Sequence, residues 1–129
     1  MATWLQRQPQ VQAVHHPALA GGVQGERYRR YFQGASSLFS FQLDGGPAAV
    51  RAFVNALTLF QLGVSWGGYE SLVYPAAIGL GSPPGPNAQR DFGVPADLIR
   101  LHVGLEDPAD LITDLQEALN AGEAAMSSS

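Results

Sequence analysis

Residues 63–71 read Gly-Val-Ser-Trp-Gly-Gly-Tyr-Glu-Ser and lie between two apolar runs. The paired glycines, Gly67 and Gly68, give the backbone conformations that other residues rarely adopt. A large aromatic residue beside such a turn predicts a loop that presents side chains on a rigid scaffold. We therefore interpret the other segments in relation to this loop and to a second segment, residues 98–105.

The composition is that of a globular protein that is able to bury a core. The chain has 129 residues, which suits one domain, and 46% of them are hydrophobic while 14% are charged. A net charge of −4 argues against nucleic acid or an anionic membrane as a partner. Apolar runs are too short to span a membrane and the first residues do not form a signal peptide, so we expect a cytoplasmic protein.

Two residue types are missing, and each absence excludes a class of chemistry. The chain has no cysteine, which rules out disulfides and thiolate metal sites. All seven basic residues are arginines, so the chain has no lysine. Chemistry that needs a side-chain amine cannot be carried out by this polypeptide alone.

The hydrophobic pattern predicts four strands and four helices. Alternation or short apolar runs predict strands at residues 11–15, 38–43, 72–74 and 98–103. Helices are predicted at residues 2–8 and 24–32, from Pro47, and from Asp107 to a terminator at Gly122. We expect residues 76–95 to form a surface loop and residues 123–129 to form a disordered tail. In the second helix, Tyr28, Tyr31 and Phe32 are expected to face inward.

The predicted strands alternate with helices, and several of the strands have one polar face. This pattern indicates an α+β fold. We predict a small mixed or antiparallel sheet covered by helices, in one domain that spans residues 1–122.

Arg100 is the strongest candidate for a binding residue, because it interrupts an apolar strand. Burying its charge without a nearby anion would cost on the order of several kcal/mol. The planar guanidinium suits a carboxylate held by two parallel hydrogen bonds. That carboxylate can belong to a ligand or to an internal acid such as Glu70 or Glu106, and the sequence leaves both open.

Three other patterns suggest chemistry but have simpler explanations. Residues 63–67 fit the G-x-S-x-G pattern of a hydrolase, followed by Asp97 and His102, but paired glycines are a poor start for the helix that this motif needs. His15 and His16 are neighbours on a strand and point to opposite faces, so they cannot share one metal ion. Three arginines and two tyrosines within residues 27–31 resemble an RNA-binding helix, but the acidic total favours a solvated or interface helix.

Three blocks in the same order resemble the cystathionine β-lyase branch of the Cys/Met metabolism pyridoxal-phosphate enzymes. They are residues 34–41 (Gly-Ala-Ser-Ser-Leu-Phe-Ser-Phe), residues 65–72 (Ser-Trp-Gly-Gly-Tyr-Glu-Ser-Leu) and residues 98–107 (Leu-Ile-Arg-Leu-His-Val-Gly-Leu-Glu-Asp). The resemblance runs from about Trp4 to Leu119. It covers only the smaller C-terminal domain of these fold-type I enzymes, so the N-terminal cofactor domain is expected to be absent from this chain.

The resemblance implies a substrate-recognition role. The position of Arg100 binds the substrate α-carboxylate in the family, and the positions of Ser65 and Trp66 line the same pocket. Trp66 together with Tyr69 favours the β-lyase branch, which cleaves cystathionine to homocysteine, pyruvate and ammonia. The cofactor of the family is pyridoxal 5′-phosphate, which its enzymes hold through a Schiff-base lysine.

This chain has no lysine, so it is expected to bind no cofactor covalently, to supply no catalytic residue and to be inactive alone. We expect it to bind a cystathionine-like amino acid together with the missing cofactor domain, and to be able to form homo-oligomers. The alternative is a non-catalytic interaction module or truncated remnant that kept the fold. A metal site, nucleic acid and a membrane are not expected.

Overall fold

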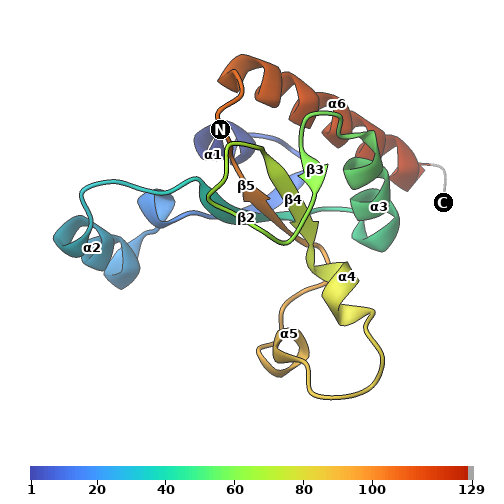
Figure 1. Ribbon diagram of the computed structural model, residues 1–129, viewed down its shortest axis with the longest axis horizontal. Helices are drawn as coiled ribbons and strands as arrows, with labels where there is room; N and C mark the ends of the chain where they lie inside the picture. Colours follow the sequence, from blue (N-terminus) through green and yellow to red (C-terminus); the bar gives the residue numbers. More distant parts are fainter. Residues whose placement is uncertain (128–129) are drawn as a thin grey trace.

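The computed structural model describes residues 1–127 and has the mixed α+β fold that the sequence predicts. Its five-stranded sheet has the order β1-β2-β5-β4-β3 (Figure 1). The strands are β1 (Val11–His15), β2 (Leu38–Leu43), β3 (Gln61–Leu62), β4 (Leu72–Pro75) and β5 (Leu98–His102). Neighbouring strands are antiparallel except β3 and β4, which are parallel, so the sheet is mixed. The four predicted strands are confirmed, whereas β3 was not predicted.

The helices differ in how closely they approach the sheet. They are α1 (Ala2–Leu5), the 3-10 turn η1 (Pro17–Leu19), α2 (Gly22–Tyr31), α3 (Gly46–Ala56), α4 (Ala76–Leu80), α5 (Ala88–Asp91) and α6 (Pro108–Ser127). Figure 1 shows α3 and α6 packed side by side, while α2 and the α4–α5 segment project away from the sheet. None of the helices in residues 1–127 is long and apolar enough to cross a membrane.

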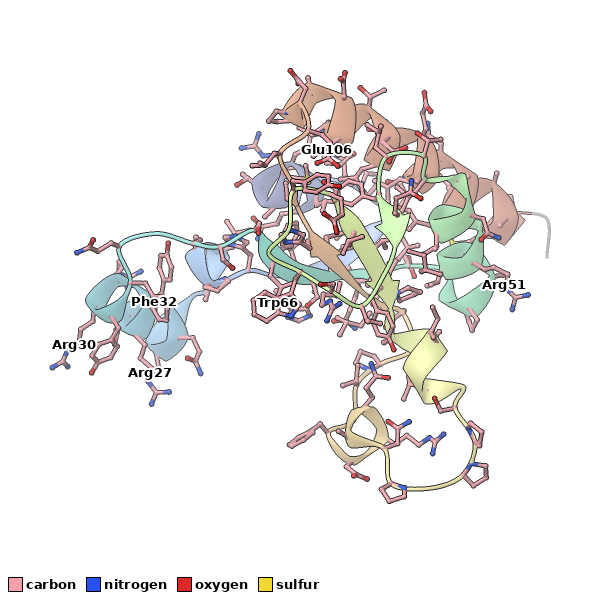
Figure 2. The ribbon with its side chains drawn as sticks, viewed as in Figure 1. Arg27, Arg30, Phe32, Arg51, Trp66 and Glu106 are labelled. Atoms are coloured by element: carbon pink, nitrogen blue, oxygen red, sulfur yellow. The ribbon has the colours of Figure 1, made fainter. Side chains whose placement is uncertain are left out.

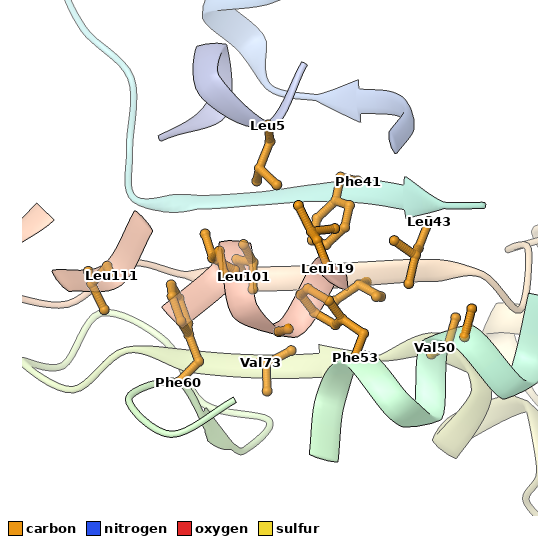
Figure 3. Close-up of a cluster of buried hydrophobic side chains, with 14 of the residues drawn as sticks. Leu5, Phe41, Leu43, Val50, Phe53, Phe60, Val73, Leu101, Leu111 and Leu119 are labelled. Atoms are coloured by element: carbon orange, nitrogen blue, oxygen red, sulfur yellow. The ribbon is translucent and has the colours of Figure 1, made fainter. Parts of the chain in front are cut away.

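One face of the sheet is buried under α1, α3 and α6. Period-two alternation places Phe39, Phe41 and Leu43 of β2 on this face, and all three are buried. They pack against one apolar stripe from each covering helix, as Figure 3 shows for Leu5, Phe53 and Leu119. The core lies between this face and the helices, so the opposite face of the sheet is left for polar side chains.

The prediction that Tyr31 and Phe32 face inward is wrong. Their exposed fractions are 68% and 62%, because α2 extends from the body and packs mainly against η1. Tyr28 stacks on Phe32 with ring centroids 5.9 Å apart, and the Arg30 guanidinium lies 5.3 Å from the Tyr31 ring centroid. The amphipathic pattern of this helix therefore serves contacts within the projecting segment and not the core.

The prediction of an irregular loop at residues 76–95 is also wrong where α4 and α5 form. Asn87 caps α5, because its Oδ1 accepts hydrogen bonds from the backbone N–H groups of Gln89 and Arg90, at 3.0 and 3.3 Å. Its Nδ2 donates to the Gly79 carbonyl at 2.8 Å, which ties the two helices together. One asparagine thus orders a segment whose prolines and glycines predict a loop.

Helix α6 continues past Gly122, so the predicted terminator there and the predicted disorder of residues 123–127 are wrong. Gly122 is a close-packing position: a Cβ there would lie 3.3 Å from the Ala49 carbonyl oxygen and 3.6 Å from Phe53 Cβ. Beyond it, Gln10 Nε2 donates to Glu123 Oε2 at 2.7 Å, and Met126 packs on the core. The last two residues of the predicted tail, 128–129, lie outside the described residues.

Candidate functional site

Three side chains form a row across the polar face of the sheet. Arg100 of β5 is the register partner of Ser40 on β2 and of Tyr74 on β4. Side chains of directly paired strand residues point to the same face. The three therefore lie side by side, opposite the core, with the cation between two hydroxyl-bearing residues.

The guanidinium of Arg100 is held by neutral groups and not by an acid. Its Nη2 donates to the Val64 carbonyl at 2.7 Å, and its Cζ lies 5.3 Å from the Tyr74 ring centroid. Of the two internal acids proposed as partners, Glu106 binds Ser71 instead. Within residues 1–127 no carboxylate pairs with Arg100, so its remaining donors are available to a ligand.

A cavity of about 200 Å³ opens beside this row. The sheet supplies Ser40, Tyr74, Leu98 and Arg100, and the α4–α5 segment supplies Ala76, Gln89 and Val94. None of these seven residues is acidic. The cavity is therefore small, partly apolar and positively charged at one wall, which suits a small carboxylate.

The loop at residues 63–71 is fixed to β5 near its middle by a buried histidine. His102 is 3% exposed, and its Nε2 lies 3.0 Å from the Gly68 carbonyl oxygen. Nδ1 lies 3.0 Å from the Ser37 hydroxyl oxygen, and the Gly67 N–H donates to the ring, with its nitrogen 3.2 Å from Nε2. The ring thus joins the loop to the segment that precedes β2.

The end of the loop is fixed by Glu106 and Ser71. Glu106 accepts from the Ser71 backbone N–H and hydroxyl, both at 2.8 Å, and the Ser71 hydroxyl oxygen accepts from the Gly104 N–H at 2.8 Å. Burial alone would raise the pKa of Glu106, but the hydrogen bonds from Ser71 outweigh it and hold that pKa below its usual value. We call the contacts of Arg100, His102 and Glu106 with residues 63–71 the loop latch.

Ser65 and Trp66 lie on the exposed part of the loop, between the contacts that fix it. Trp66 is 62% exposed, and Ser65 is exposed as well. The structure brings the backbone of their loop to Arg100 through Val64, and it places Trp66 at the molecular surface (Figure 2). Their role in carboxylate recognition stays a prediction.

The hydrolase interpretation is not supported by this geometry. No helix follows Ser65, because residues 63–71 are irregular until β4 begins at Leu72. The His102 ring hydrogen bonds with Ser37 and with the loop backbone. Asp97 Oδ1 accepts a 3.5 Å hydrogen bond from Gln42 and is not bonded to the histidine. The three residues therefore do not form a catalytic triad.

The neighbouring histidines have separate partners. His15 Nε2 lies 3.1 Å from Gln42 Oε1, whereas His16 Nδ1 accepts from the Ala18 N–H at 3.2 Å and caps η1. Across residues 1–127, no cluster of three or more His, Asp or Glu side chains is arranged to hold a metal ion.

Asp114 supports the approach to the loop and was not identified from the sequence. It is 4% exposed, and its carboxylate accepts four hydrogen bonds of 2.7–3.1 Å from the backbone N–H groups of residues 58–60 and the Thr58 hydroxyl. Burial opposes its charge, but these hydrogen bonds lower its pKa below the usual value. Its position three residues after Leu111, within the apolar stripe of α6, was the available signal.

Proteins similar to this chain include cystathionine lyases and an L-alanine/L-glutamate racemase of Wolbachia pipientis wMel, which is 38% identical over 121 residues. The model of the Cys/Met metabolism PLP-dependent enzyme family matches residues 1–120. The chain belongs to this family.

Individual relatives carry several activities in their names. A cystathionine β-lyase of Bordetella avium is 43% identical over 119 residues, which are 91% of this chain and 28% of the relative. An L-methionine γ-lyase of Pseudomonas putida is 41% identical over 121 residues, which are 94% of this chain and 30% of the relative. The chain thus spans less than a third of the length of these relatives.

A solved structure agrees with the fold. The cystathionine γ-synthase of Xanthomonas oryzae pv. oryzae, in complex with cystathionine, superposes with a TM-score of 0.85 at 36% identity. The match covers 96% of this chain and 32% of the solved one. Lyases and a synthase are therefore similar to this chain to nearly the same degree, and the family is shown more firmly than any one activity.

Proposed function

We propose that this chain is the substrate-recognition part of a PLP-dependent carbon–sulfur lyase of the cystathionine β-lyase type. The observation that carries the proposal is the cavity of about 200 Å³ beside Arg100, which we call the Arg100 cavity. In it a guanidinium without an acidic partner faces a small space free of carboxylates. Such a group binds a carboxylate through charge-assisted hydrogen bonds. The α-carboxylate of an amino-acid substrate is the ligand that the proposal assigns to it.

In this proposal the loop latch keeps residues 63–71, which we call the recognition loop, in place before the substrate binds. The proposal assigns Ser65 and Trp66 to the border of the carboxylate pocket. The loop that carries them is fixed by Arg100, His102 and Glu106. A loop that is already ordered loses less conformational entropy on binding than a mobile loop does. The combination of Trp66 and Tyr69 supports the β-lyase type over the γ-synthase and γ-lyase types.

The residues of this chain do not fit covalent attachment of pyridoxal phosphate. The attachment is a Schiff base with a lysine amine, and the chain has no lysine. We therefore assign the chain to recognition of the substrate and derive no step of the reaction from it. The cofactor and its lysine would come from another part of the enzyme.

A chimera tests the proposal. This chain would replace the matching segment of the Bordetella avium cystathionine β-lyase, and cleavage of cystathionine would be followed by release of pyruvate. The chimera should be active, and Arg100→Ala should raise KM by roughly 100-fold, because loss of a charged hydrogen-bonded partner costs about 2–5 kcal/mol. Arg100→Lys is the matched control that keeps the charge and loses the planar fork. An unchanged KM in Arg100→Ala would refute the assignment.

The β-lyase type needs its own test. Placed in the Pseudomonas putida L-methionine γ-lyase instead, the chain should increase the share of pyruvate among the products formed from cystathionine. Trp66→Leu should reverse this increase, whereas Trp4→Leu, at a tryptophan outside the loop, should not. A product ratio that does not respond to Trp66 would remove the argument for the β-lyase type and leave the wider family function intact.

Exposed apolar side chains favour a second candidate, an interaction module, and are also compatible with a covered surface in the larger enzyme. Phe92 and Leu105 are each 86% exposed, and Tyr31 and Phe32 project on α2. Tyr31 and Phe32 adjoin in the chain, and patches of exposed apolar residues are common at interfaces. Sedimentation of the chain alone would distinguish an interaction module from a covered surface of the larger enzyme. A stable homo-oligomer without carboxylate binding would favour the interaction module.

A further inference from the structure

Gln89 faces the Arg100 cavity from the side opposite the sheet. It belongs to α5, whereas Ser40, Tyr74 and Arg100 come from three adjacent strands. The ordering of α5 by Asn87 fixes the place of Gln89, whose own N–H is one of the two capped by the Asn87 side chain. The cavity therefore has a polar side chain on the wall formed by α5, in addition to those on the sheet.

The two polar atoms of the Gln89 amide have different surroundings. The oxygen, Oε1, is buried and accepts no hydrogen bond. It lies against Gly79, where a Cβ would overlap it, and the Tyr74 hydroxyl oxygen would lie 2.9 Å from that same Cβ. The nitrogen, Nε2, is not buried in this way and donates to no acceptor within residues 1–127. The amide is thus held with its oxygen in the wall and its N–H groups free.

An orphaned buried carbonyl is costly and needs an explanation. If the amide were rotated by 180°, Nε2 would take the buried position. The energetic cost of a buried polar atom without a partner would remain unless Nε2 found an acceptor there. With Oε1 buried, Nε2 is the polar atom of the amide that is not enclosed in the wall. The same cavity is lined by Arg100, which has further donors, and by no acidic residue. The chemistry on both walls therefore suits an anion.

We propose that Gln89 is the second carboxylate-binding residue of the Arg100 cavity. Its Nε2 donates to one carboxylate oxygen of the ligand, and the guanidinium of Arg100 donates to the other. This inference rests on the proposed function, since both concern the same carboxylate. The cavity of about 200 Å³ limits the group bound between the two walls to the size of a short-chain carboxylate or the end of an amino acid.

The test uses this chain, uniformly labelled with ¹⁵N, and follows its side-chain NMR signals during titration with butyrate. The Arg100 Nε–H and Gln89 Nε2 signals should both shift, while the neutral isostere butyramide should shift neither. Gln89→Leu should weaken butyrate binding roughly tenfold, the order expected for one hydrogen bond to a charged group. Gln89→Glu should weaken it further, because it places a carboxylate beside the bound anion.

Matched controls separate a local effect from a general one. Gln33 is exposed and outside the cavity, so Gln33→Leu and Gln33→Glu reproduce the same chemical changes and should leave the affinity unchanged. Gly79→Ala is an independent probe, because its methyl group would overlap Oε1 and displace the amide. It should weaken binding about as much as Gln89→Leu while Gln89 itself is kept.

Each outcome is decisive. If butyrate shifts Arg100 but the Gln89 signal and the Gln89 variants are unaffected, the inference is wrong and the proposed function stands. If butyrate shifts neither residue, both are wrong. Should Gln89→Leu fail to fold, judged by circular dichroism, the butyrate-specific shift of Gln89 in the unaltered chain decides the question.

Discussion

The recognition loop and the α2 segment both expose aromatic side chains, but they are held in opposite ways. Trp66 and Tyr31 have similar exposed fractions, 62% and 68%. The loop is hydrogen bonded by Arg100 and His102 on β5 and by Glu106 just beyond it. The α2 segment relies largely on ring contacts among its own residues and on η1. Exposure therefore does not by itself indicate how firmly a surface residue is positioned.

The difference has a functional meaning under the proposed function. A pocket for one carboxylate needs donors held to within a fraction of an ångström, which the loop latch can provide. A segment that contacts another domain or chain needs to extend from the body more than it needs precisely positioned side chains. Substitutions that remove the supports of the loop, and then the side chains of α2, test this contrast.

Among the supports of the loop, the largest effect is expected from Asp114→Ala, which removes the support of residues 58–60. Three backbone N–H groups would lose a charged acceptor, one of them buried, and we expect a loss of about 3 kcal/mol in the free energy of unfolding. Urea denaturation followed by circular dichroism measures it. Asp110→Ala is the control, since Asp110 is exposed on the same helix. Equal, small effects of both substitutions would contradict the buried hydrogen-bond network.

The same carboxylates should make stability depend on pH. The folded-state pKa values of Asp114 and Glu106 lie below their ordinary values of 3.8 and 4.5. Their contribution to stability is therefore complete above those ordinary values and is lost as the pH falls through the lower folded-state values. Urea midpoints should decrease as the pH is lowered from 6 into this acidic range. The decrease should be smaller in a variant with Asp114→Asn and Glu106→Gln, and an unchanged pH profile would contradict the lowered pKa values.

Glu106→Gln should have a smaller effect on stability, one centred on the loop. Glutamine can still accept the Ser71 N–H hydrogen bond through Oε1, but its amide nitrogen cannot accept from the Ser71 hydroxyl. We expect a loss of about 1 kcal/mol and faster amide hydrogen exchange in residues 63–71. Combining it with Ser71→Ala in a double-mutant cycle should give a coupling energy, because the two side chains touch. Additive effects would mean that the loop latch does not depend on this pair.

The sequence predicts what depends on local pattern and misses what depends on contacts made in three dimensions. Strict alternation located β2 and its buried face, and the Asp107-Pro108 start of α6 is confirmed by a 2.7 Å hydrogen bond from the Ala109 N–H to Asp107. Residues 61–62 pair with β4 only through tertiary structure, and a two-residue strand has no periodicity to detect.

The candidate site was predicted in part. Arg100 is recognisable because a charge in an apolar strand is unusual, and the structure places it in a row and a cavity. Other residues around Arg100 and the loop come from remote segments. Gln89, which lines the same cavity, lies in a segment whose sequence predicts a loop, and Glu106 lies 35 residues beyond its partner Ser71. Such pairings have no signature in one sequence, because they depend on which backbone groups the fold leaves without partners. The inward assignment of Tyr31 and Phe32 failed because a helical stripe does not identify the surface that covers it.

The smallest effect on stability is expected from the α2 segment, with Tyr31→Ser and Phe32→Ser combined. Both side chains are mostly exposed, so little apolar burial is lost and the free energy of unfolding should change by less than about 0.5 kcal/mol. Phe53→Ala in the core is the contrast, at roughly 3–5 kcal/mol. The double α2 variant should also leave butyrate binding unchanged, since neither residue lines the Arg100 cavity. A loss well above 1 kcal/mol would mean that α2 packs on the body in solution, and the two regions would then differ in degree and not in kind.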